Sequence, residues 1–570
     1  MNRVDLTVVV VYLGAMIGLG CWLARRSGST SQFMTAGGSL SGWAVGLSIF
    51  GTYVSSISFL ANPGKSFSGN WNGWVFGLSL PLVAWLAAKY FVPFYRNHGH
   101  ISAYAHLEER FGGWARTYAA ICYLLTQLAR MGTIMYLVAL GLQPLTGWEV
   151  RSIIMITGLL VTTYTMLGGI EAVIRTDAIQ SVVLTIGAVL CLGLILWRLP
   201  EGPGQVFEIA RGQGKFSLGS LSPDLTQSTF WVVLLFGFVI NLQNFGIDQS
   251  YVQRYHTAVD ERAAVHSVWI GALLYLPISG LLFFIGTALF AFYGQYPELG
   301  PEAVDGVVKA DAYFPHFIAT QLPAGMTGLL VAAIFAAAMS SVDSSLNSSA
   351  TLILEDFVKR YFCREPTERT SMLVLYTTTL VLGVGGTGAA LLMIHIQGAL
   401  DAWWQLSGIF AGGMLGLFLM GMIARHARRP AAVTAVVCGV AVICWATFSP
   451  GWSKAKGSLQ VQAGDVVTVT NGLQLVPGDR IVISDGEQFW HRRADAIQRI
   501  QDAAADRQRM TIDQPIAKDI PHADVYYDNF LYTIRNPLHN LLTIVLGTMT
   551  ILLVGLTITR IADRRRAADA

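Results

Sequence analysis

The sequence predicts an all-α membrane protein with about thirteen transmembrane helices and one small soluble α+β insertion. Composition gives the first indication, because 53% of the 570 residues are hydrophobic and only 13% are charged. A soluble domain usually carries about 25% charged residues. The second indication is a series of apolar runs of about 20 residues, the length that crosses a bilayer. We therefore expect the lipid bilayer to surround most of the chain.

The predicted transmembrane helices are distributed along almost the whole chain. Arg25 and Arg26 follow the first apolar run without a small-residue cleavage site, so we interpret this run as a retained helix and not as a signal peptide. The apolar runs lie at residues 4–24, 42–62, 71–95, 115–144, 150–167, 172–198, 229–247, 266–292, 322–351, 371–395, 402–424, 430–449 and 538–560.

Composition also argues against several classes of function. The net charge of +3 and the scattered basic residues are not typical of a nucleic-acid-binding protein. The six cysteines lie apart from one another, without the spacing of a disulfide scaffold or a zinc site. We find no nucleophile and base in an arrangement that would support catalysis. We therefore expect neither an enzyme nor a bound cofactor.

The distribution of lysine and arginine predicts the orientation of the chain. Cations gather in alternate loops, and the loops between them are poor in cations until residue 451. Because cytoplasmic loops carry the excess of cations, we expect the N-terminus outside and the C-terminus in the cytoplasm, in the plasma (inner) membrane. The cations in question are Arg25, Arg26, Arg96, Arg110, Arg175, Arg254, Arg262, Lys359, Arg360, Arg364, Arg425, Arg428, Arg429, Arg560, Arg564, Arg565 and Arg566.

The chain divides into three predicted parts. Residues 1–450 form a transmembrane core, residues 451–536 a soluble insertion on the outer face, and residues 537–570 the last transmembrane helix with a cytoplasmic tail. Within the insertion, the sequence predicts strands at Asp465–Thr470 and Arg480–Ser484, a turn at Asn471-Gly472 and a helix near Phe489–Asp506. A lid or a stability module is the simpler interpretation of the insertion, and binding of a ligand or partner is the alternative.

Two predicted spans contain residues that interrupt a helix. In the second span, Gly51 and a cluster of serines favour local unwinding, and Pro63-Gly64 is expected to end the regular helix. The seventh span has the same character between Gly237 and Asp248. Non-helical backbone survives in a membrane only where it is buried in protein or lines a wet cavity. Paired interruptions indicate a solute site, and close packing of helices at glycine is the alternative.

The ninth span carries a cluster of oxygen-bearing side chains. Six serines lie between Ser340 and Ser349, with Asp343 among them. A single serine in a membrane helix often donates a hydrogen bond only to a carbonyl of the preceding turn. That local bond does not explain six hydroxyls and a carboxylate in one segment. Oxygen ligands without thiols or imidazoles suit Na⁺ and other hard cations. The sequence therefore predicts a cation site on this helix.

Charged side chains inside the predicted spans are few, and each is costly to bury. Arg130 lies in the middle of the fourth span, too far from either end to reach the interface easily. Its guanidinium requires an anion, which could be Asp248, Asp343 or a carboxylate of the solute. Asp177, just inside the sixth span, is a second candidate ion ligand, and a pair with Arg175 is the alternative.

These motifs together resemble the sodium:solute symporter family. Gly168–Gln180 is similar to the family's signature between the fifth and sixth spans, and Asp248–Arg254 is similar to its motif after the broken seventh span. Met339-Ser340-Ser341 with Asn347-Ser348 resembles its sodium-site helix. The matches run from about residue 4 to residue 449 and leave the insertion uncovered. The resemblance implies the leucine-transporter type of fold, in which spans two to six and seven to eleven form an inverted repeat.

The resemblance also implies sodium ligands. For the main site they are the carbonyls of Gly51, Val54 and Ala337 and the hydroxyls of Ser340 and Ser341. For the second site of some members they are Asp177, Ser340, Asp343 and Ser344. Asp343 stands where a hydroxyl residue is common in those members. It could strengthen a second cation site or bind a proton.

Among subgroups, the chain looks most like bacterial sialic acid transporters. There the arginine that matches Arg130 holds the substrate carboxylate, and hydroxyls that match Ser55 and Ser58 hold its polar groups. Ser58 replaces a glutamine that contacts sugar in the galactose branch, which argues against a plain hexose. Tyr53 is bulkier than expected beside this site. The full expected substrate site is Ser55, Ser58, Arg130, Asp248 and Gln249.

The resemblance therefore implies a sodium-coupled importer that works by alternating access, with Na⁺ as the coupling ion. We expect a small anionic solute, with sialic acid as the first cargo to consider, and a monomeric protein. A sodium symporter for a sugar, polyol, vitamin or other monocarboxylate is one alternative. A sensor that binds solute without moving it is another.

Overall fold

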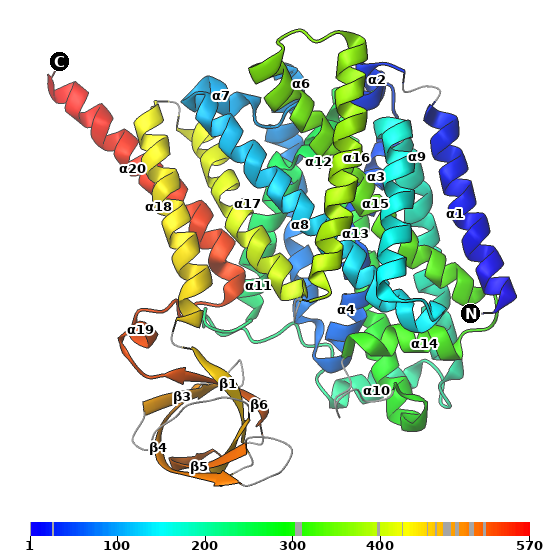
Figure 1. Cartoon of the computed structure of the whole chain (residues 1–570), viewed down its shortest axis with the longest axis vertical. Coiled ribbons are helices and arrows are strands. Elements are labelled where there is room, and N and C mark those ends of the chain that lie inside the picture. Colours follow the sequence, from blue (N-terminus) through cyan, green and yellow to red (C-terminus); the bar gives the residue numbers. More distant parts are fainter. Residues whose placement is uncertain are drawn as a thin grey trace.

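The computed structural model of the chain is a bundle of long helices with a small β-barrel at one end (Figure 1). The predicted turn at Asn471-Gly472 and the cations Arg25, Arg26 and Arg425 lie outside the described residues. The structure describes residues 2–24, 28–301, 310–395, 399–424, 426–452, 454–461, 464–470, 480–484, 489–500, 507–516 and 520–569.

The helical membrane architecture predicted from composition is confirmed. Ten helices within the described ranges are long and apolar enough to cross a membrane, and the bent pair α3 (Gly42–Tyr53) and α4 (Ser56–Ser68) adds an eleventh. Two predicted spans, 150–167 and 172–198, fall within the 49-residue helix α9 (Val150–Arg198). The predicted span 402–424 falls in α17 (Ala399–Ile423), whose apolar part Ser407–Ile423 is shorter.

Helix α15 (Met326–Leu352) lies at the centre of the bundle and α1 (Arg3–Ala24) lies at its edge (Figure 1). In the apolar stretch that contains α15, 94% of the residues are buried, against 22% in α1. The oxygen-rich ninth span is therefore enclosed by protein and not by lipid. The other elements of the bundle are α2 (Thr30–Thr35), η1 (Ala36–Gly38), η2 (Trp71–Ser79), α5 (Leu80–Leu86), η3 (Ala87–Phe91), α6 (Val92–His98), α7 (Ala105–Phe111), α8 (Gly113–Thr146), α10 (Gly204–Gly212), α11 (Phe230–Ile247), α12 (Gln249–Thr257), α13 (Glu261–Gln295), η4 (Pro297–Leu299), η5 (Ala310–Ala312), α14 (Tyr313–Gln321), η6 (Ile353–Phe362), α16 (Glu368–Met393), α18 (Arg429–Phe448) and α20 (Thr543–Asp569).

The interruptions expected in the second and seventh spans are present. Helix α3 ends at Tyr53, and the next helix follows at an angle of 52° after Val54 and extended Ser55. Helix α11 ends at Ile247, and Asp248 has extended backbone angles before α12 begins. The Asp248 side chain accepts a hydrogen bond from the Ser250 N–H at 2.8 Å, which caps the new helix. Both breaks leave backbone polar groups inside the bundle.

The prediction that Pro63-Gly64 ends the helix is wrong, because α4 continues through Pro63 to Ser68. Helix α13 makes room for the proline, since a Cβ on Gly286 would lie 2.0 Å from the Pro63 carbonyl oxygen. The Ser66 hydroxyl donates to the Phe283 carbonyl oxygen at 2.7 Å and ties the two helices together. Neighbouring helices and serines allow proline inside a membrane helix in this way.

Helix α9 changes direction at Gly169, where φ is 60° and ψ is −163°. These angles lie in a region that residues with a side chain rarely adopt. A Cβ at this position would also lie 3.0 Å from the Cα of Phe33. Glycine therefore allows α9 to change direction between the two predicted spans.

The insertion is a closed six-stranded antiparallel barrel in the strand order β1-β2-β5-β4-β3-β6. Its inner core contains Ile481, Ile483, Met510 and Val525, all fully buried. The short helix α19 (Phe530–Thr533) and the turn η8 (Asn540–Leu542) lead from the barrel to α20. The strands are β1 (Lys454–Val461), β2 (Gly464–Thr470), β3 (Arg480–Ser484), β4 (Phe489–Ile500), β5 (Arg507–Ile516) and β6 (Ile520–Tyr527).

The helix predicted near Phe489–Asp506 is wrong for all of its described residues, because Phe489–Ile500 is strand β4. Buried Ala494 and half-buried Trp490 alternate with exposed His491 and Arg493, which is the period of a strand. The helix-forming Ala, Gln and Arg residues hide this alternation. Pairing with β3 on one side and β5 on the other outweighs the local preference.

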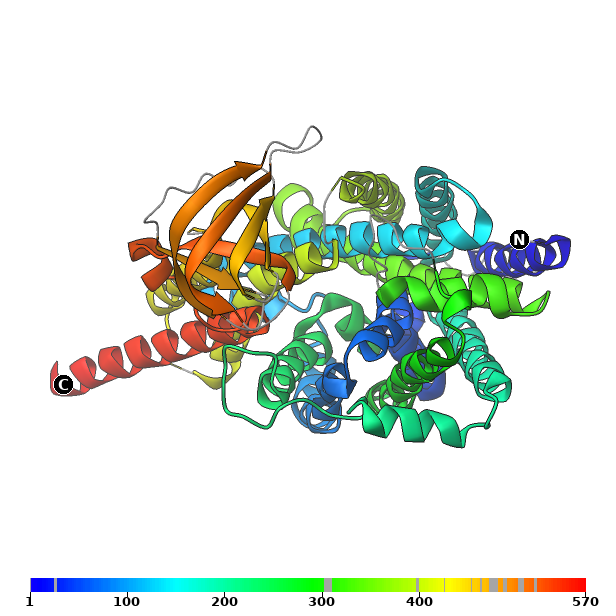
Figure 2. The same cartoon turned by 90° about the horizontal axis from the view of Figure 1, so that it is seen from below.

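The N-terminus and the barrel lie at the same side of the bundle, and the C-terminus lies at the opposite side (Figure 1). Seen from below, the barrel occupies one end of its face, over the C-terminal helices and away from the N-terminus (Figure 2). The rest of that face is free of the barrel.

Candidate functional site

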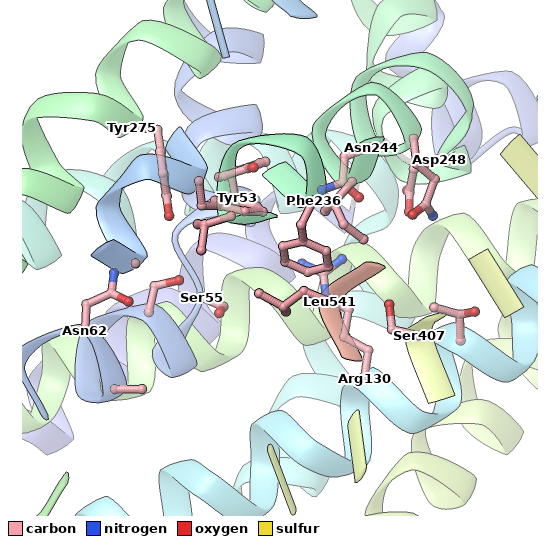
Figure 3. A pocket seen from close by; sticks show the side chains of 18 of the residues that line it. Tyr53, Ser55, Asn62, Arg130, Phe236, Asn244, Asp248, Tyr275, Ser407 and Leu541 are labelled. Carbon is pink, nitrogen blue, oxygen red and sulfur yellow. The ribbon is translucent and has the colours of Figure 1, made fainter. Parts of the chain in front are cut away.

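A cavity of about 500 Å³ lies between the two broken helix pairs, with α8 along one side (Figure 3). Asp248 and Gln127 are buried in its lining, whereas Ser228 is exposed and lies in the loop before α11, which the Leu225 carbonyl joins to the segment after the barrel. Pockets for small organic ligands typically measure about 300–1,000 Å³. The lining residues are Tyr53, Ser55, Ser58, Ala61, Asn62, Lys65, Gly73, Phe76, Thr126, Gln127, Arg130, Ile134, Ser228, Val233, Phe236, Ile240, Gln243, Asn244, Asp248, Tyr251, Tyr275, Ser407, His539 and Leu541.

Arg130 extends from α8 into this cavity (Figure 3). Its Nη2 donates to the Thr52 carbonyl oxygen at 3.0 Å. Within the described ranges, no carboxylate forms an ion pair with this guanidinium. Of the two protein anions that the sequence offered, Asp248 accepts bonds from Ser250, and Asp343 accepts from the Tyr164 hydroxyl at 2.5 Å. The charge of Arg130 is thus available to a ligand in the cavity.

Four of the five residues predicted for the substrate site line the cavity: Ser55, Ser58, Arg130 and Asp248. Gln249 does not. Its amide oxygen accepts from the Ala103 N–H at 2.7 Å, and its amide nitrogen donates to the Ile101 carbonyl at 3.0 Å. Gln249 therefore holds the loop before α7, on the far side of the helix break from the cavity.

A second, narrow cavity lies where α3, α9 and α15 meet. It contains Gly51, Val54, Ala337 and Ser340, four of the five residues predicted for the main sodium site. The fifth, Ser341, lies one residue further along α15 and donates to the Ala337 carbonyl at 3.3 Å. The remaining lining residues are Phe50, Gln180, Ser181, Leu184 and Ala336.

Glycine at position 51 is required for this junction. A Cβ there would lie 2.5 Å from the Ser181 Oγ of α9 and 3.2 Å from the Ser340 Oγ of α15. A side chain would therefore push α3 away from both neighbours. The structure brings the carbonyl-bearing end of α3 against hydroxyls of α15, which is the arrangement that a Na⁺ site needs.

Two of the residues predicted for a second sodium site, Asp177 and Ser344, bind a buried arginine. The Arg254 Nη2 donates to the Asp177 carboxylate at 3.0 Å and to the Ser344 hydroxyl at 2.6 Å. Arg254 is 1% exposed, so its assignment to a cytoplasmic loop is wrong. The alternative partner of Asp177 is also wrong, since Arg175 pairs with Glu171 at 2.8 Å.

Asp343 lies in the same buried cluster as Asp177 and Arg254. Two carboxylates and one guanidinium leave one negative charge when both acids are ionised. Burying a net charge is costly, so one further cation or one proton would be favourable here. Both interpretations of Asp343, as a cation ligand and as a proton acceptor, are consistent with this charge balance.

Tyr53 forms part of the cavity wall, and its role was not predicted from the sequence. Its hydroxyl donates to the amide oxygen of Asn241, whose amide nitrogen donates to the Ser79 hydroxyl at 2.8 Å. Its ring packs edge-on against Tyr275, with ring centres 4.6 Å apart. These partners come from α11, η2 and α13, so only the folded arrangement reveals the contact.

His539 and Leu541 line the cavity from the segment that follows the barrel. Burial lowers the pKa of the His539 imidazole below its ordinary value, so the ring is uncharged at neutral pH. Its Nδ1 can then accept the Leu541 N–H at 3.3 Å. The backbone N–H of His539 donates to the Leu225 carbonyl at 2.9 Å, which joins this segment to the loop before α11. Sequence spacing gives no signal for this distant contribution.

Comparison with known proteins agrees with the geometry. Residues 33–439 match the model of the sodium:solute symporter family. The sodium/sialic acid symporter NanT of Aliivibrio fischeri is 35% identical over 76% of this chain and 86% of its own. The sodium/sialic acid symporter SiaT of Proteus mirabilis is 33% identical over 85% of this chain and 98% of its own.

The fold is also similar to a solved structure, a substrate-bound outward-open state of a Na⁺-coupled sialic acid symporter. The TM-score is 0.79, with 26% identity over 98% of each chain. The range matched by the family model includes both broken helix pairs, the whole lining of the narrow cavity and the lining of the large cavity except for His539 and Leu541. The chain belongs to the sodium:solute symporter family, and it is a sodium-coupled membrane transporter and not an enzyme.

Proposed function

We propose that the protein imports a small carboxylated solute together with Na⁺, and that sialic acid is the first cargo to test. Arg130 is the observation that carries this proposal. Its guanidinium lies in the large cavity without an ion pair to any described carboxylate. A carboxylate is the group that matches a guanidinium in a two-bond contact. The names of the NanT and SiaT relatives support sialic acid in particular.

Serines on the broken helix are proposed to hold the polar groups of the cargo. Ser55 and Ser58 reach the same cavity as Arg130 from α4 and the residues just before it. Buried Asp248 can accept hydrogen bonds from hydroxyl or amide groups of the cargo, and buried Gln127 can both donate and accept them. This combination suits a carboxylated molecule with several hydrogen-bonding groups.

Na⁺ is proposed to bind where Gly51 and Val54 of the broken second span meet Ala337, Ser340 and Ser341 of α15. An ion there would hold the two helices together and favour the state whose cavity is open. Cargo and ion would then strengthen each other's binding, and this coupling must be reciprocal. Each Na⁺ that moves inward through 100 mV contributes about 2.3 kcal/mol. Asp177, Ser340, Asp343 and Ser344 are the candidate ligands for a second ion.

Orientation is proposed from the cations, with the barrel and the N-terminus outside and the C-terminus in the cytoplasm, in the plasma (inner) membrane. Under this orientation the large cavity faces the outside, since its exposed end lies toward the barrel. A single chain supplies every residue of both proposed sites, so the mechanism operates in a monomer.

A sodium symporter for an uncharged solute is the alternative. It is favoured by the bond from Arg130 to the Thr52 carbonyl, which gives the arginine a structural partner. In that case Arg130 would stabilise the break in the second span and would not contact the cargo. The charge of the transported solute separates the two proposals.

Uptake of labelled N-acetylneuraminate into proteoliposomes tests the function directly. We expect accumulation with an inward Na⁺ gradient and none when K⁺ replaces Na⁺ on both sides. Absence of sodium-driven uptake would rule out sialic acid as the cargo. Uptake of a panel of carboxylated and uncharged solutes would then be measured.

Variants of the two sites give the first prediction. Ser340→Ala should raise the Na⁺ concentration for half-maximal uptake by about tenfold, because it removes one oxygen from the ion. Arg130→Ala should abolish uptake of a carboxylated cargo, whereas an uncharged cargo would still be transported. The matched control is Ser349→Ala, on the same helix but outside both cavities, which should behave like the wild type. Unchanged uptake in both site variants would contradict the assignment.

A further inference from the structure

We propose that Gln180 of α9 is an additional Na⁺ ligand, so that the coupling ion joins three elements and not only the second and ninth spans. This inference rests on the proposed Na⁺-coupled function. Gln180 lines the narrow cavity together with Gly51, Val54, Ala337 and Ser340. It is 1% exposed and comes from a helix that the main-site prediction does not include.

The amide of Gln180 has no hydrogen-bond partner on either its oxygen or its nitrogen. Two other atoms at the same junction are also buried without a partner, the Asp177 Oδ1 and the Ser340 Oγ. Asp177 and Gln180 are three residues apart on α9, so both side chains leave the same face of the helix. An unpaired polar group inside a protein costs about 1–3 kcal/mol, and three together require an explanation.

Buried water does not supply that explanation. Polar groups inside a protein are often satisfied by a bound water. The narrow cavity leaves no room for a water molecule. A dehydrated Na⁺ is smaller than water and binds oxygen atoms directly. An amide oxygen, a hydroxyl and a carboxylate oxygen are all ligands of the kind that hard cations select.

The chemistry of Gln180 also suits the balance of charge. The nearby cluster already contains Asp177, Asp343 and Arg254, so a neutral oxygen adds coordination without adding charge. An amide can turn by 180° to present its oxygen to the ion, while its nitrogen faces away. Tyr12 of α1 also lies close to Gln180, and its hydroxyl is likewise buried without a partner. A bond between Gln180 and Tyr12 is the purely structural alternative.

Na⁺ binding to the purified full chain without cargo tests the inference. The protein is titrated with NaCl, and choline chloride keeps the ionic strength constant. The signal is the intrinsic tryptophan fluorescence or the thermal unfolding temperature. Gln180→Leu keeps the size of the side chain and removes the oxygen, so we expect the half-saturating Na⁺ concentration to rise about tenfold. Gln180→Glu restores an oxygen with a negative charge, so it should bind Na⁺ at least as tightly as the wild type.

Two control variants separate ion binding from packing. Thr157→Val removes a buried and equally unpartnered hydroxyl from the same helix, away from the cavity. Tyr12→Phe removes the hydroxyl on which the structural alternative depends. Both should leave the Na⁺ titration within about twofold of the wild type. If Gln180→Leu fails to fold, Gln180→Asn is the second variant. Its side chain is one methylene shorter, so the amide oxygen lies further from the ion and Na⁺ binding should again weaken.

Two results would overturn the inference. One is an unchanged Na⁺ titration in Gln180→Leu or in Gln180→Asn, and the other is an equal loss in Tyr12→Phe. Either of these, with a normal response of the wild type, leaves the proposed function standing. A wild-type protein that does not respond to Na⁺ at all would instead refute the proposed function.

Discussion

Arg254 holds together the centre of the transporter with a single guanidinium. It donates five hydrogen bonds, to side chains on α3, α9 and α15 and to a carbonyl of its own helix. Arginine suits this position because its planar fork offers five donors and is always charged. The broken seventh span is therefore fastened to the helices that carry the proposed ion site.

Loss of this arginine should be strongly destabilising. Arg254→Gln leaves the Asp177 carboxylate buried without its counter-charge, which typically costs about 3–5 kcal/mol. We expect a clear drop in the thermal unfolding temperature of the purified protein. Asp177→Asn alone should also destabilise, and the double variant should recover part of the loss because no charge is left uncompensated. Strictly additive effects in this cycle would contradict direct coupling of the pair.

Residues differ in how well their roles can be predicted from the sequence. Arg130 and Asp177 were predicted as functional because a charge inside an apolar span needs a reason. Arg254 was predicted as a loop cation because it follows a motif rich in polar residues. That prediction was wrong because the break before α12 does not lead into a solvent-exposed loop. Gln249 was predicted for the wrong contact because neighbouring residues on a helix point in different directions. Sequence shows which residue types are costly, but their partners depend on the fold.

Three elements at the face opposite the barrel are joined by a network of ion pairs. Arg116 at the start of α8 pairs with buried Asp356 of η6 and with Glu108 of α7 at 3.1 Å. Glu108 also pairs with Arg360 of η6 at 2.9 Å. The Ser102 hydroxyl completes the network by donating to Asp356 at 2.8 Å. These contacts join α7, the start of α8 and η6 to one another at this face.

Arg116→Ala should therefore destabilise this network of ion pairs. Asp356 would remain buried without a cation, a loss of about 3 kcal/mol by analogy with other buried pairs. The matched control is Lys359→Ala, which breaks a partly exposed pair with Glu355 on the same element and should cost about 0.5 kcal/mol. Thermal unfolding in detergent or nanodiscs measures both. Equal effects of the two substitutions would show that burial of the pair is unimportant.

Helices and strands were predictable where one pattern dominates. Long apolar runs identified the membrane helices, and Gly51 with its serines identified the broken second span. Pro63 was misread because its accommodation depends on Gly286, more than two hundred residues away in the chain. Strand β4 was misread because its helix-forming residues gain their pairing partners only in the barrel. Long-range contacts therefore account for both errors.

The barrel is attached to the bundle by two neighbouring strands. Lys454 at the start of β1 pairs with Tyr526 near the end of β6, so the two connections to the bundle leave side by side. The returning connection then passes through α19 to His539 and Leu541 at the large cavity. At the scale of the whole molecule, the segment after the barrel reaches the large cavity, whereas the narrow cavity is lined by residues of α3, α9 and α15 and by Val54.

Removal of the barrel tests this separation. Replacing residues 454–527 by a short Gly-Ser linker should preserve Na⁺ binding within about twofold, since paired strand ends lie only about 5 Å apart. The KM for cargo should rise, because His539 and Leu541 would lose the anchoring of their segment. Uptake assays and Na⁺ titration measure the two effects. A loss of Na⁺ binding in a folded deletion variant would contradict the separation.

The partnership of Asp177 and Arg254 also has a consequence for biogenesis. The carboxylate precedes the guanidinium by 77 residues in the chain, so during synthesis it reaches the bilayer before its counter-charge exists. An unpaired charge is costly in lipid. We therefore expect one of two outcomes. Either the Asp177 carboxyl stays protonated in the bilayer, or its helix stays in the hydrated translocon until α12 has been made. The same pair that stabilises the finished transporter would then set the order in which its helices are released into the membrane.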